Sequence, residues 1–262
     1  TAGKTTLAGE GLQHQDGHSH LMASTIPNLK SYDPAYSYEI AIIIQYGLKD
    51  MYKWQNNVFY YITLENENYI HPKLPSYDIV DDVIKGMYCI SNNSKSKKIK
   101  IQLLGSGPML NEVIKASEIL MEDWDIEASI WSVTSYSELH RDAESVSRWN
   151  NLHPDSVPKK SHLKKKINSD NGPVVAVSDY VKLVAEQISP YIDCPFIALG
   201  TDGFGRSATR EQLRDFFEVN HHYIVLSSIN ILVKSGILRK DNLKKAIEKY
   251  NIDSEKSNPN SV

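Results

Sequence analysis

The stretch from Ile99 to Met121, IKIQLLGSGPMLNEVIKASEILM, decides the architecture of this 262-residue chain. Residues 99–104 are mostly isoleucine and leucine, which predicts a buried strand. Glycines and a proline at 105–108 predict a tight turn, and apolar residues then recur at three- and four-residue spacing over 109–121, which predicts an amphipathic helix. Together these elements form one β-α unit.

The same alternation continues toward the carboxyl terminus. Further strands are predicted at 127–133, 173–177 and 196–199. Helices are predicted from 139 onward and at 180–188, 210–219, 223–235 and 241–250. Repeated β-α units joined by short turns indicate an α/β fold with a largely parallel sheet that is covered on both faces.

The segment upstream of residue 75 gives a second α/β pattern. The run VFYYITL at 58–64 is β-branched and aromatic, which predicts a strand buried on both faces of a parallel sheet. A short strand is expected at 28–32 and an amphipathic helix at 34–52, whereas residues 1–25 are expected to be mostly loop. The polar residues 65–68 follow the strand at 58–64, at the end where open α/β sheets bind ligands.

Between these two patterns the periodicity breaks down. We therefore predict an amino-terminal domain at 1–75, a connector at 76–95 with a possible edge strand at 86–90, and a carboxyl-terminal domain at 96–262. The basic run at 159–166 is predicted to be a solvated loop, and the glycines at 105–107 and 200–205 form tight turns, since neither turn has dinucleotide-binding spacing. Arg206 and Arg210 are assigned a minor structural role.

Composition excludes several classes of protein. With 29 basic and 32 acidic residues the formal net charge is −3, which gives no reason to expect a nucleic acid or an anionic membrane as a partner. The two cysteines, Cys89 and Cys194, are too few for a disulfide framework. No apolar run approaches the ~20 residues that span a bilayer, so a cytoplasmic location is expected.

The heptapeptide HQDGHSH at 14–20 has the highest local concentration of proton-carrying and metal-ligating side chains in the sequence. Its three histidines and one aspartate lie beside Gly17, which allows a sharp turn, so their side chains can converge on a small volume. Such a group can hold and transfer protons around a substrate, or it can bind a divalent metal. It is equally compatible with a polar surface loop. Gly17 and Ser19 argue against a helix here.

The longer context of this heptapeptide resembles a known enzyme family. The strings GEGLQHQDGHSHL, TIPNLKSYDPAYSYE, YYITLENENY and ALGTDGFGRSATREQLRDFFEV follow one another at family-like distances, and the resemblance runs essentially from Thr1 to Val262. They resemble the homodimeric, acetyl-transferring pyruvate dehydrogenase, the first component of the bacterial pyruvate dehydrogenase complex. The family members are several times longer, so the resemblance implies the end of a transketolase-like pyrimidine-binding domain followed by a transketolase-type carboxyl-terminal domain.

The resemblance implies a function and a set of site residues. The family decarboxylates pyruvate on thiamine diphosphate and Mg²⁺, and then acetylates the lipoyl group of the dihydrolipoamide acetyltransferase component. By this resemblance His20 and then His18 are the first choices for contact with substrate, and His14 and Asp16 support them. No metal ligand or cofactor-binding residue is assigned, because the diphosphate motif and the activating glutamate are expected upstream. The active site would form between two subunits, and this chain alone is expected to be inactive.

Two alternatives stay open at the level of sequence. The chain could be a noncatalytic α/β module that pairs with a separate amino-terminal chain. A metal-dependent hydrolase built on His14, Asp16, His18 and His20 is the other alternative. Gln15 stands where the family often has glutamate, and this replacement keeps hydrogen bonding but removes a charge, so its role is left open.

Overall fold

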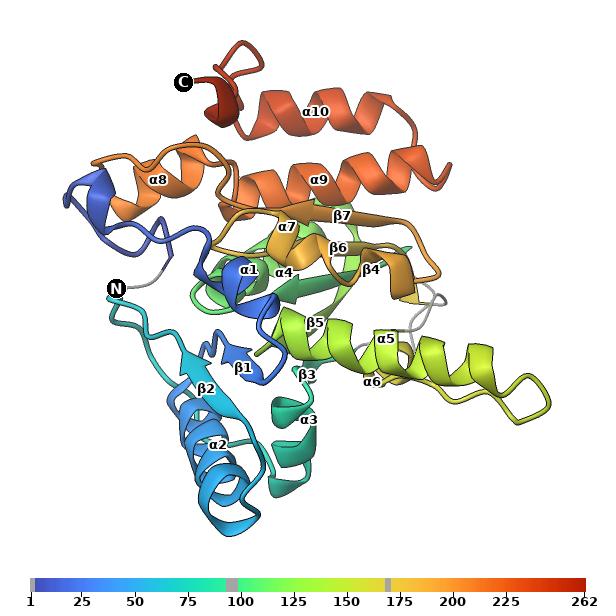
Figure 1. The fold of residues 1–262 in the computed structure, drawn as a ribbon. Coiled ribbons are helices and arrows are strands. Elements are labelled where there is room, and N and C mark those ends of the chain that lie inside the picture. Colours follow the sequence, from blue (N-terminus) through green and yellow to red (C-terminus); the bar gives the residue numbers. More distant parts are fainter. Residues whose placement is uncertain (1–2, 93–98, 168–170) are drawn as a thin grey trace.

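A computed structural model of the chain describes residues 3–92, 99–167 and 171–262. These residues form two sheets, a small one close to the amino terminus and a larger one at the centre of the molecule (Figure 1). None of the helices in the described ranges has both the length and the apolar character needed to cross a membrane.

The small sheet consists of β1 (Leu29–Tyr32) and β2 (Phe59–Ile62), which pair in parallel. They are joined by α2 (Ser37–Leu48) and a π-helical turn, η2 (Lys49–Lys53). The predicted strands and helix are confirmed, but the expected burial of β2 on both faces is wrong. Phe59 is 45% exposed, because a sheet of two strands has too few neighbours to cover both of its faces.

The larger sheet has five strands in the order β3-β5-β4-β6-β7. Their bounds are β3 (Met87–Ser91), β4 (Ile99–Gly105), β5 (Ile126–Val133), β6 (Val174–Val177) and β7 (Phe196–Leu199). Edge strand β3 is antiparallel to β5, and the other described pairs are parallel. The predicted α/β class with a largely parallel sheet is therefore confirmed.

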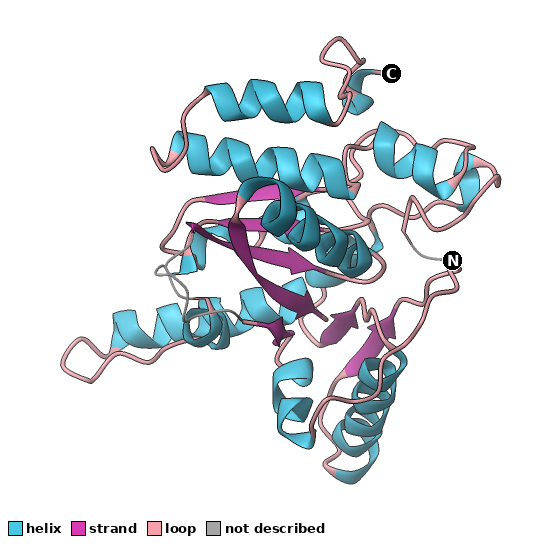
Figure 2. Ribbon diagram, turned by 180° about the vertical axis from the view of Figure 1, so that it is seen from behind, coloured by secondary structure: helices cyan, strands magenta, loops and turns pink. Residues whose placement is uncertain are grey.

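Helices cover both faces of the larger sheet, as Figure 2 shows from behind. One face packs against α4 (Met109–Trp124) and α9 (His221–Lys234), with α10 (Asp241–Lys249) outside α9. The other face packs against α5 (Tyr136–Leu152), α6 (His162–Lys166) and α7 (Leu183–Glu186). Successive side chains of a strand point to opposite faces of the sheet, so β4 contributes to the hydrophobic core on each face. Ile101 and Leu103 pack on the face of α4 and α9, and Leu104 packs on the face of α5, α6 and α7.

Several short elements differ from the sequence prediction. The predicted connector contains η3 (Tyr77–Ile79), α3 (Val80–Ile84) and β3. Strand β3 confirms the edge strand expected at 86–90. Residues 93–95 of the connector lie outside the described ranges. The segment 1–25, expected to be loop, contains η1 (Leu12–His14) and α1 (Ser19–Ser24). The basic run contains α6, and the helix expected at 180–188 shortens to α7 followed by η5 (Ser189–Tyr191). The remaining elements are α8 (Arg210–Phe216) and η6 (Pro259–Ser261).

Candidate functional site

Polar side chains from both sheets meet where their parallel strands end. Asp33 follows β1, Thr63 follows β2 and Ser106 follows β4. The two sheets are joined at this junction by backbone bonds, since Asp33 N donates to Thr134 O at 2.8 Å and Gly107 N donates to Asp33 O at 3.0 Å. This end of a parallel sheet is the usual position of a ligand site in open α/β folds.

His20 takes part in a buried hydrogen-bond chain at this junction. Its Nε2 lies 2.9 Å from Thr63 Oγ1, and the Thr63 hydroxyl lies 2.8 Å from Asp33 Oδ1 and 3.2 Å from Tyr32 O. Both of those oxygens only accept, so the Thr63 hydroxyl donates to one of them and must accept from His20. This directionality places the proton of the neutral imidazole on Nε2 and leaves Nδ1 as an acceptor.

The surroundings of His20 keep its imidazole neutral. The side chain is 5% exposed, and the edges or faces of Tyr61 and Tyr180 lie against it with ring centroids 5.5 Å and 4.6 Å away. Burial lowers the pKa of His20, and the carboxylates of Asp33 and Asp16 offset only part of that effect. The adjoining cavity has a volume of about 10 Å³, which is room for about one water molecule.

The other residues of the heptapeptide do not converge on His20. Asp16 Oδ1 accepts from the backbone N–H groups of His18 and Ser19 at 3.0 Å each, so its carboxylate caps α1. His18 and His14 are exposed on the surface. The expectation that Ser19 opposes a helix is wrong, because Ser19 begins α1 and its hydroxyl donates to Asp16.

This arrangement does not support the metal-dependent hydrolase. The four residues of that hypothesis are a helix cap, two exposed imidazoles and one buried imidazole bound to a hydroxyl. Within residues 3–92, 99–167 and 171–262, no group of three histidine, cysteine, aspartate or glutamate side chains is arranged to hold a metal ion.

Two further buried carboxyls, Glu65 and Asp179, lie close to Asp33. The backbone N–H of Thr5 donates to both oxygens of Asp179 at 3.2 and 3.1 Å. Burial raises the pKa of Asp179 to about 7, with Arg214 and the Thr5 N–H acting in the opposite direction. Burial also raises the pKa of Glu65 well above its usual value, and the nearby charges of Asp33 and Asp179 add to that effect.

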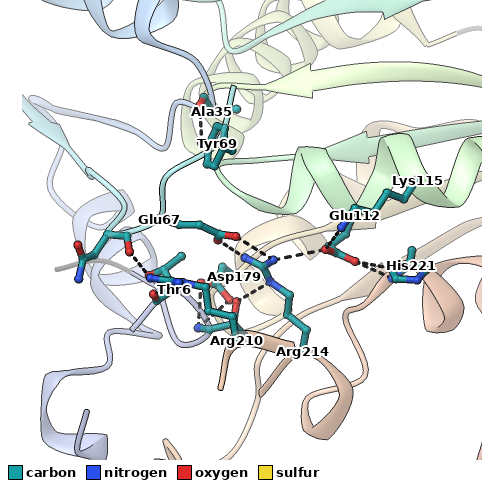
Figure 3. A network of polar contacts seen from close by, with 12 residues as sticks. Thr6, Ala35, Glu67, Tyr69, Glu112, Lys115, Asp179, Arg210, Arg214 and His221 are labelled. Carbon is teal, nitrogen blue, oxygen red and sulfur yellow. Dashed lines mark hydrogen bonds and ion pairs between the residues drawn. The ribbon is translucent and has the colours of Figure 1, made fainter. Parts of the chain in front are cut away.

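An ion-pair network around Arg214 on α8 joins the segment after β2 to helices α4 and α9 (Figure 3). The Arg214 guanidinium binds Glu67 through both of its terminal nitrogens and lies 3.3 Å from Glu112 Oε1 on α4. Glu112 also accepts from His221 Nδ1 at 2.7 Å and pairs with Lys115 at 3.3 Å. Burial alone would raise the pKa of Glu112, but the His221 hydrogen bond and the charges of Arg214 and Lys115 outweigh it and lower the pKa to about 2.

The residues whose roles the sequence left open have structural contacts. Arg210 donates to Thr6 O at 2.7 Å and to Asn66 O at 2.6 Å, so it joins the amino-terminal loop to the segment after β2. The Gln15 amide donates to Arg206 O at 2.7 Å and accepts from Arg206 N at 2.8 Å. The Arg210 contacts are made by its side chain, whereas Gln15 binds only the backbone of Arg206, so the role of the Arg206 side chain stays a prediction.

Two family models match this chain, one in its amino-terminal part and one in its carboxyl-terminal part. Residues 86–220 match the family described as transketolase-like TK C-terminal domain, and residues 1–72 match the pyruvate dehydrogenase E1 component middle domain. The chain belongs to the transketolase-like family. The resemblance to pyruvate dehydrogenase is confirmed by relatives that are 48% and 49% identical to this chain.

Two bacterial relatives are each named pyruvate dehydrogenase E1 component. The protein of Cupriavidus necator is 48% identical over 263 residues, and that of Pseudomonas aeruginosa is 49% identical over 260 residues. These alignments cover 100% and 99% of this chain but only 29% of each relative. Among solved structures, transketolase from Leishmania mexicana matches with a TM-score of 0.61 at 16% identity, over 89% of this chain and 30% of that one, which shows a shared fold.

The described residues show no cavity beside His20 that could hold thiamine diphosphate. The cavity beside His20 is far smaller than the cofactor, and the described residues supply no metal cluster to hold its diphosphate.

Sequence reasoning found His20 but missed Thr63, Asp33, Ser106 and Arg214. The first three each follow the carboxyl end of a parallel strand directly, and this rule had already singled out residues 65–68. Applying it to β1 and β4 would have found Asp33 and Ser106. Arg214 left no such signal, because it lies inside α8 and its carboxylate partners are 147 and 102 residues away in sequence.

Proposed function

We propose that this chain is the carboxyl-terminal part of a pyruvate dehydrogenase E1 component. In our proposal the complete protein decarboxylates pyruvate on thiamine diphosphate and acetylates the lipoyl group of the dihydrolipoamide acetyltransferase component. The observation that carries the proposal is 48–49% identity to two E1 components along essentially the entire chain. A noncatalytic module is the alternative, and nothing in the geometry favours it.

We assign His20 and His18 different tasks in that enzyme. His20 is fixed inside the chain as a neutral imidazole, with Nε2–H bound to Thr63 and Nδ1 available to accept a proton or a hydrogen bond. His18 is exposed at the start of α1, so it is the imidazole that can reach a group outside this chain. Asp16 holds both in place by capping α1.

The remaining parts of the proposal concern the complete protein. Following the family resemblance, we assign the diphosphate and Mg²⁺ ligands to residues beyond this chain; the described residues contain no group of three histidine, cysteine, aspartate or glutamate side chains arranged to hold a metal ion. The relatives are more than three times as long as this chain, which leaves ample sequence for such a site. We also propose a homodimer with its active site between subunits and, following the sequence analysis, a cytoplasmic location.

A chimeric enzyme tests the proposal directly. This chain would replace the corresponding carboxyl-terminal segment of the Pseudomonas aeruginosa E1 component, and pyruvate-dependent ferricyanide reduction would be measured with thiamine diphosphate and Mg²⁺. We expect an active chimera that also supports acetylation of a lipoyl domain. A chimera that folds, dimerises and binds the cofactor but does not turn over pyruvate would contradict the proposal and favour the noncatalytic module.

Substitution of the histidines completes the test. His20→Gln is expected to lower kcat of the chimera by about 10²-fold or more, the usual range for a positioned proton-transfer group. His153→Gln is the matched control, because His153 is exposed and stacks on Trp149 at the far end of α5. Equal activity of both variants would show that His20 does not serve the reaction.

A further inference from the structure

The distal half of α5 and the segment that returns to α6 form a positively charged projection. Figure 1 shows α5 and its following loop extending away from the body of the molecule. Residues 148–166 carry six basic side chains and one acidic side chain, in a chain whose formal net charge is −3. The charge of this segment is therefore opposite in sign to that of the whole chain.

Two neighbouring hollows run along the base of this projection. One has a volume of about 610 Å³ and the other about 420 Å³, and both are lined by Lys160, Lys164, Tyr191 and Asp193. Because they share these residues, we treat them as one depression between α5, α6 and residues 190–194, which we call the α5–α6 groove. The volumes of the two hollows lie in the range of sites that bind ligands.

The lining of the groove combines an apolar floor with a basic rim. Leu163 and Ile167 are buried beneath it, and Tyr191 is half-buried at its side. The exposed ammonium groups of Lys160, Lys164 and Lys165 stand along the edge. Such a surface pairs apolar contact with attraction for negative charge.

The groove is held in shape by contacts within the projection. The Asn150 side chain bonds the backbone of Lys159 twice, accepting from its N–H at 2.8 Å and donating to its carbonyl at 3.0 Å. The Lys159 ammonium lies 3.9 Å from the centre of the Trp149 ring, and Ser161 Oγ caps α6 by accepting from Lys164 N at 3.2 Å. A partner would thus meet a preformed surface.

An acidic group already occupies one end of the rim. Asp193 pairs with Lys164 at 3.1 Å, although the two side chains are 68% and 49% exposed. An ion pair this exposed contributes little, so an incoming carboxylate can exchange with it at small cost. The Asp193–Lys164 pair shows that a lysine of this groove can bind a carboxylate.

We propose that the α5–α6 groove binds an extended acidic segment of a partner protein, with carboxylates on the lysine rim and apolar side chains between them. Charge complementarity is the argument for this occupant: exposed Lys160, Lys164 and Lys165 provide positive charge, and the buried Leu163 and Ile167 provide apolar contact. The groove is built from residues other than the His20 chain, so this binding does not depend on the proposed enzymatic activity.

Fluorescence anisotropy with a labelled peptide of alternating glutamate and leucine tests this inference. We expect saturable binding that weakens between about 0.05 M and about 0.5 M salt. The double variant Lys160→Glu and Lys165→Glu is expected to weaken binding about ten-fold or more at low salt, whereas Lys234→Glu and Lys240→Glu is expected to leave it nearly unchanged. All four lysines are exposed, and both variants reverse the same amount of charge.

Each other outcome overturns the inference. An equal loss in both double variants would mean nonspecific attraction to the whole chain. Equal binding of a lysine–leucine peptide would mean an apolar surface without charge selection. Stronger binding of single-stranded RNA or of inorganic phosphate than of the acidic peptide, lost in the Lys160→Glu and Lys165→Glu variant, would reassign the groove to nucleic acid or to a small anion.

Discussion

Replacement of Thr63 by valine isolates the contribution of the buried chain from His20 to Asp33. Thr63 is 4% exposed, and valine has nearly the same shape, so the substitution leaves no large cavity. It removes the donor to Asp33 Oδ1 and the acceptor for His20 Nε2–H. Each of these two buried polar groups costs about 1–3 kcal/mol when it is left without its partner, so we expect the free energy of unfolding to fall by about 2–6 kcal/mol.

Thr63→Ser is the matched control for this substitution. Serine keeps the hydroxyl and loses only a methyl group, which costs about 1 kcal/mol. Urea unfolding of the three proteins, followed by circular dichroism, would give the stabilities. The ¹⁵N chemical shifts of the His20 ring would report the tautomer, which we expect to be Nε2–H in wild type and in the serine variant. Equal destabilisation by valine and serine, or a wild-type Nδ1–H tautomer, would refute the reasoning.

Two further predictions concern the charged groups near this junction. Arg214→Met leaves the buried carboxylate of Glu112 without its guanidinium partner, so it should lower the free energy of unfolding by about 3–5 kcal/mol in urea titrations. The control Arg239→Met lies at an exposed position and should change the free energy of unfolding by less than about 0.5 kcal/mol. A loss from Arg214→Met no larger than that of the control would contradict a stabilising network. Asp179→Asn tests the pH dependence of stability. The pKa of Asp179 is raised to about 7 in the folded chain, so between about pH 4 and about pH 7 the folded chain holds a proton that the unfolded chain has released. This group therefore makes wild type less stable as the pH rises over that range. The difference in unfolding free energy between Asp179→Asn and wild type should therefore shift in favour of the variant over that range, and a constant difference from pH 4 to pH 8 would show that the Asp179 pKa is not raised.

The elements with long or strongly apolar periodicity were predicted well from sequence. The strand β7 has the predicted bounds Phe196–Leu199, and α10 differs from its prediction by one residue at its end. The short helices α1, α3 and α6 were not predicted. In α1 and α6 the stability comes from caps and tertiary contacts, since helices of six and five residues are too short to be stable through propensity alone. The burial of β2 was predicted wrongly, because burial depends on neighbouring strands.

The candidate site was predicted only in part. His20 was selected from a dense local cluster and from family resemblance, both of which are visible in sequence. Its partners were not, since Thr63 lies 43 residues from His20 and Asp33 lies 30 residues from Thr63. The heptapeptide itself gave no indication that Asp16 would cap a helix while His14 and His18 faced solvent.

The sequence by itself determined the α/β class and the alternation of strands and helices, because hydrophobic periodicity acts within a few neighbouring residues. It also determined membership in the transketolase-like family, because matches to family models extend over residues 1–72 and 86–220. Only the tertiary structure decided which polar groups meet. The pairing of strands brings the ends of β1, β2, β4 and β6 to one junction. There the hydrogen bond to the Thr63 hydroxyl sets the tautomer of His20, and burial raises the pKa of Asp179. Proton positions and pKa values depend on burial and on neighbours that are distant in sequence, so local patterns do not contain them.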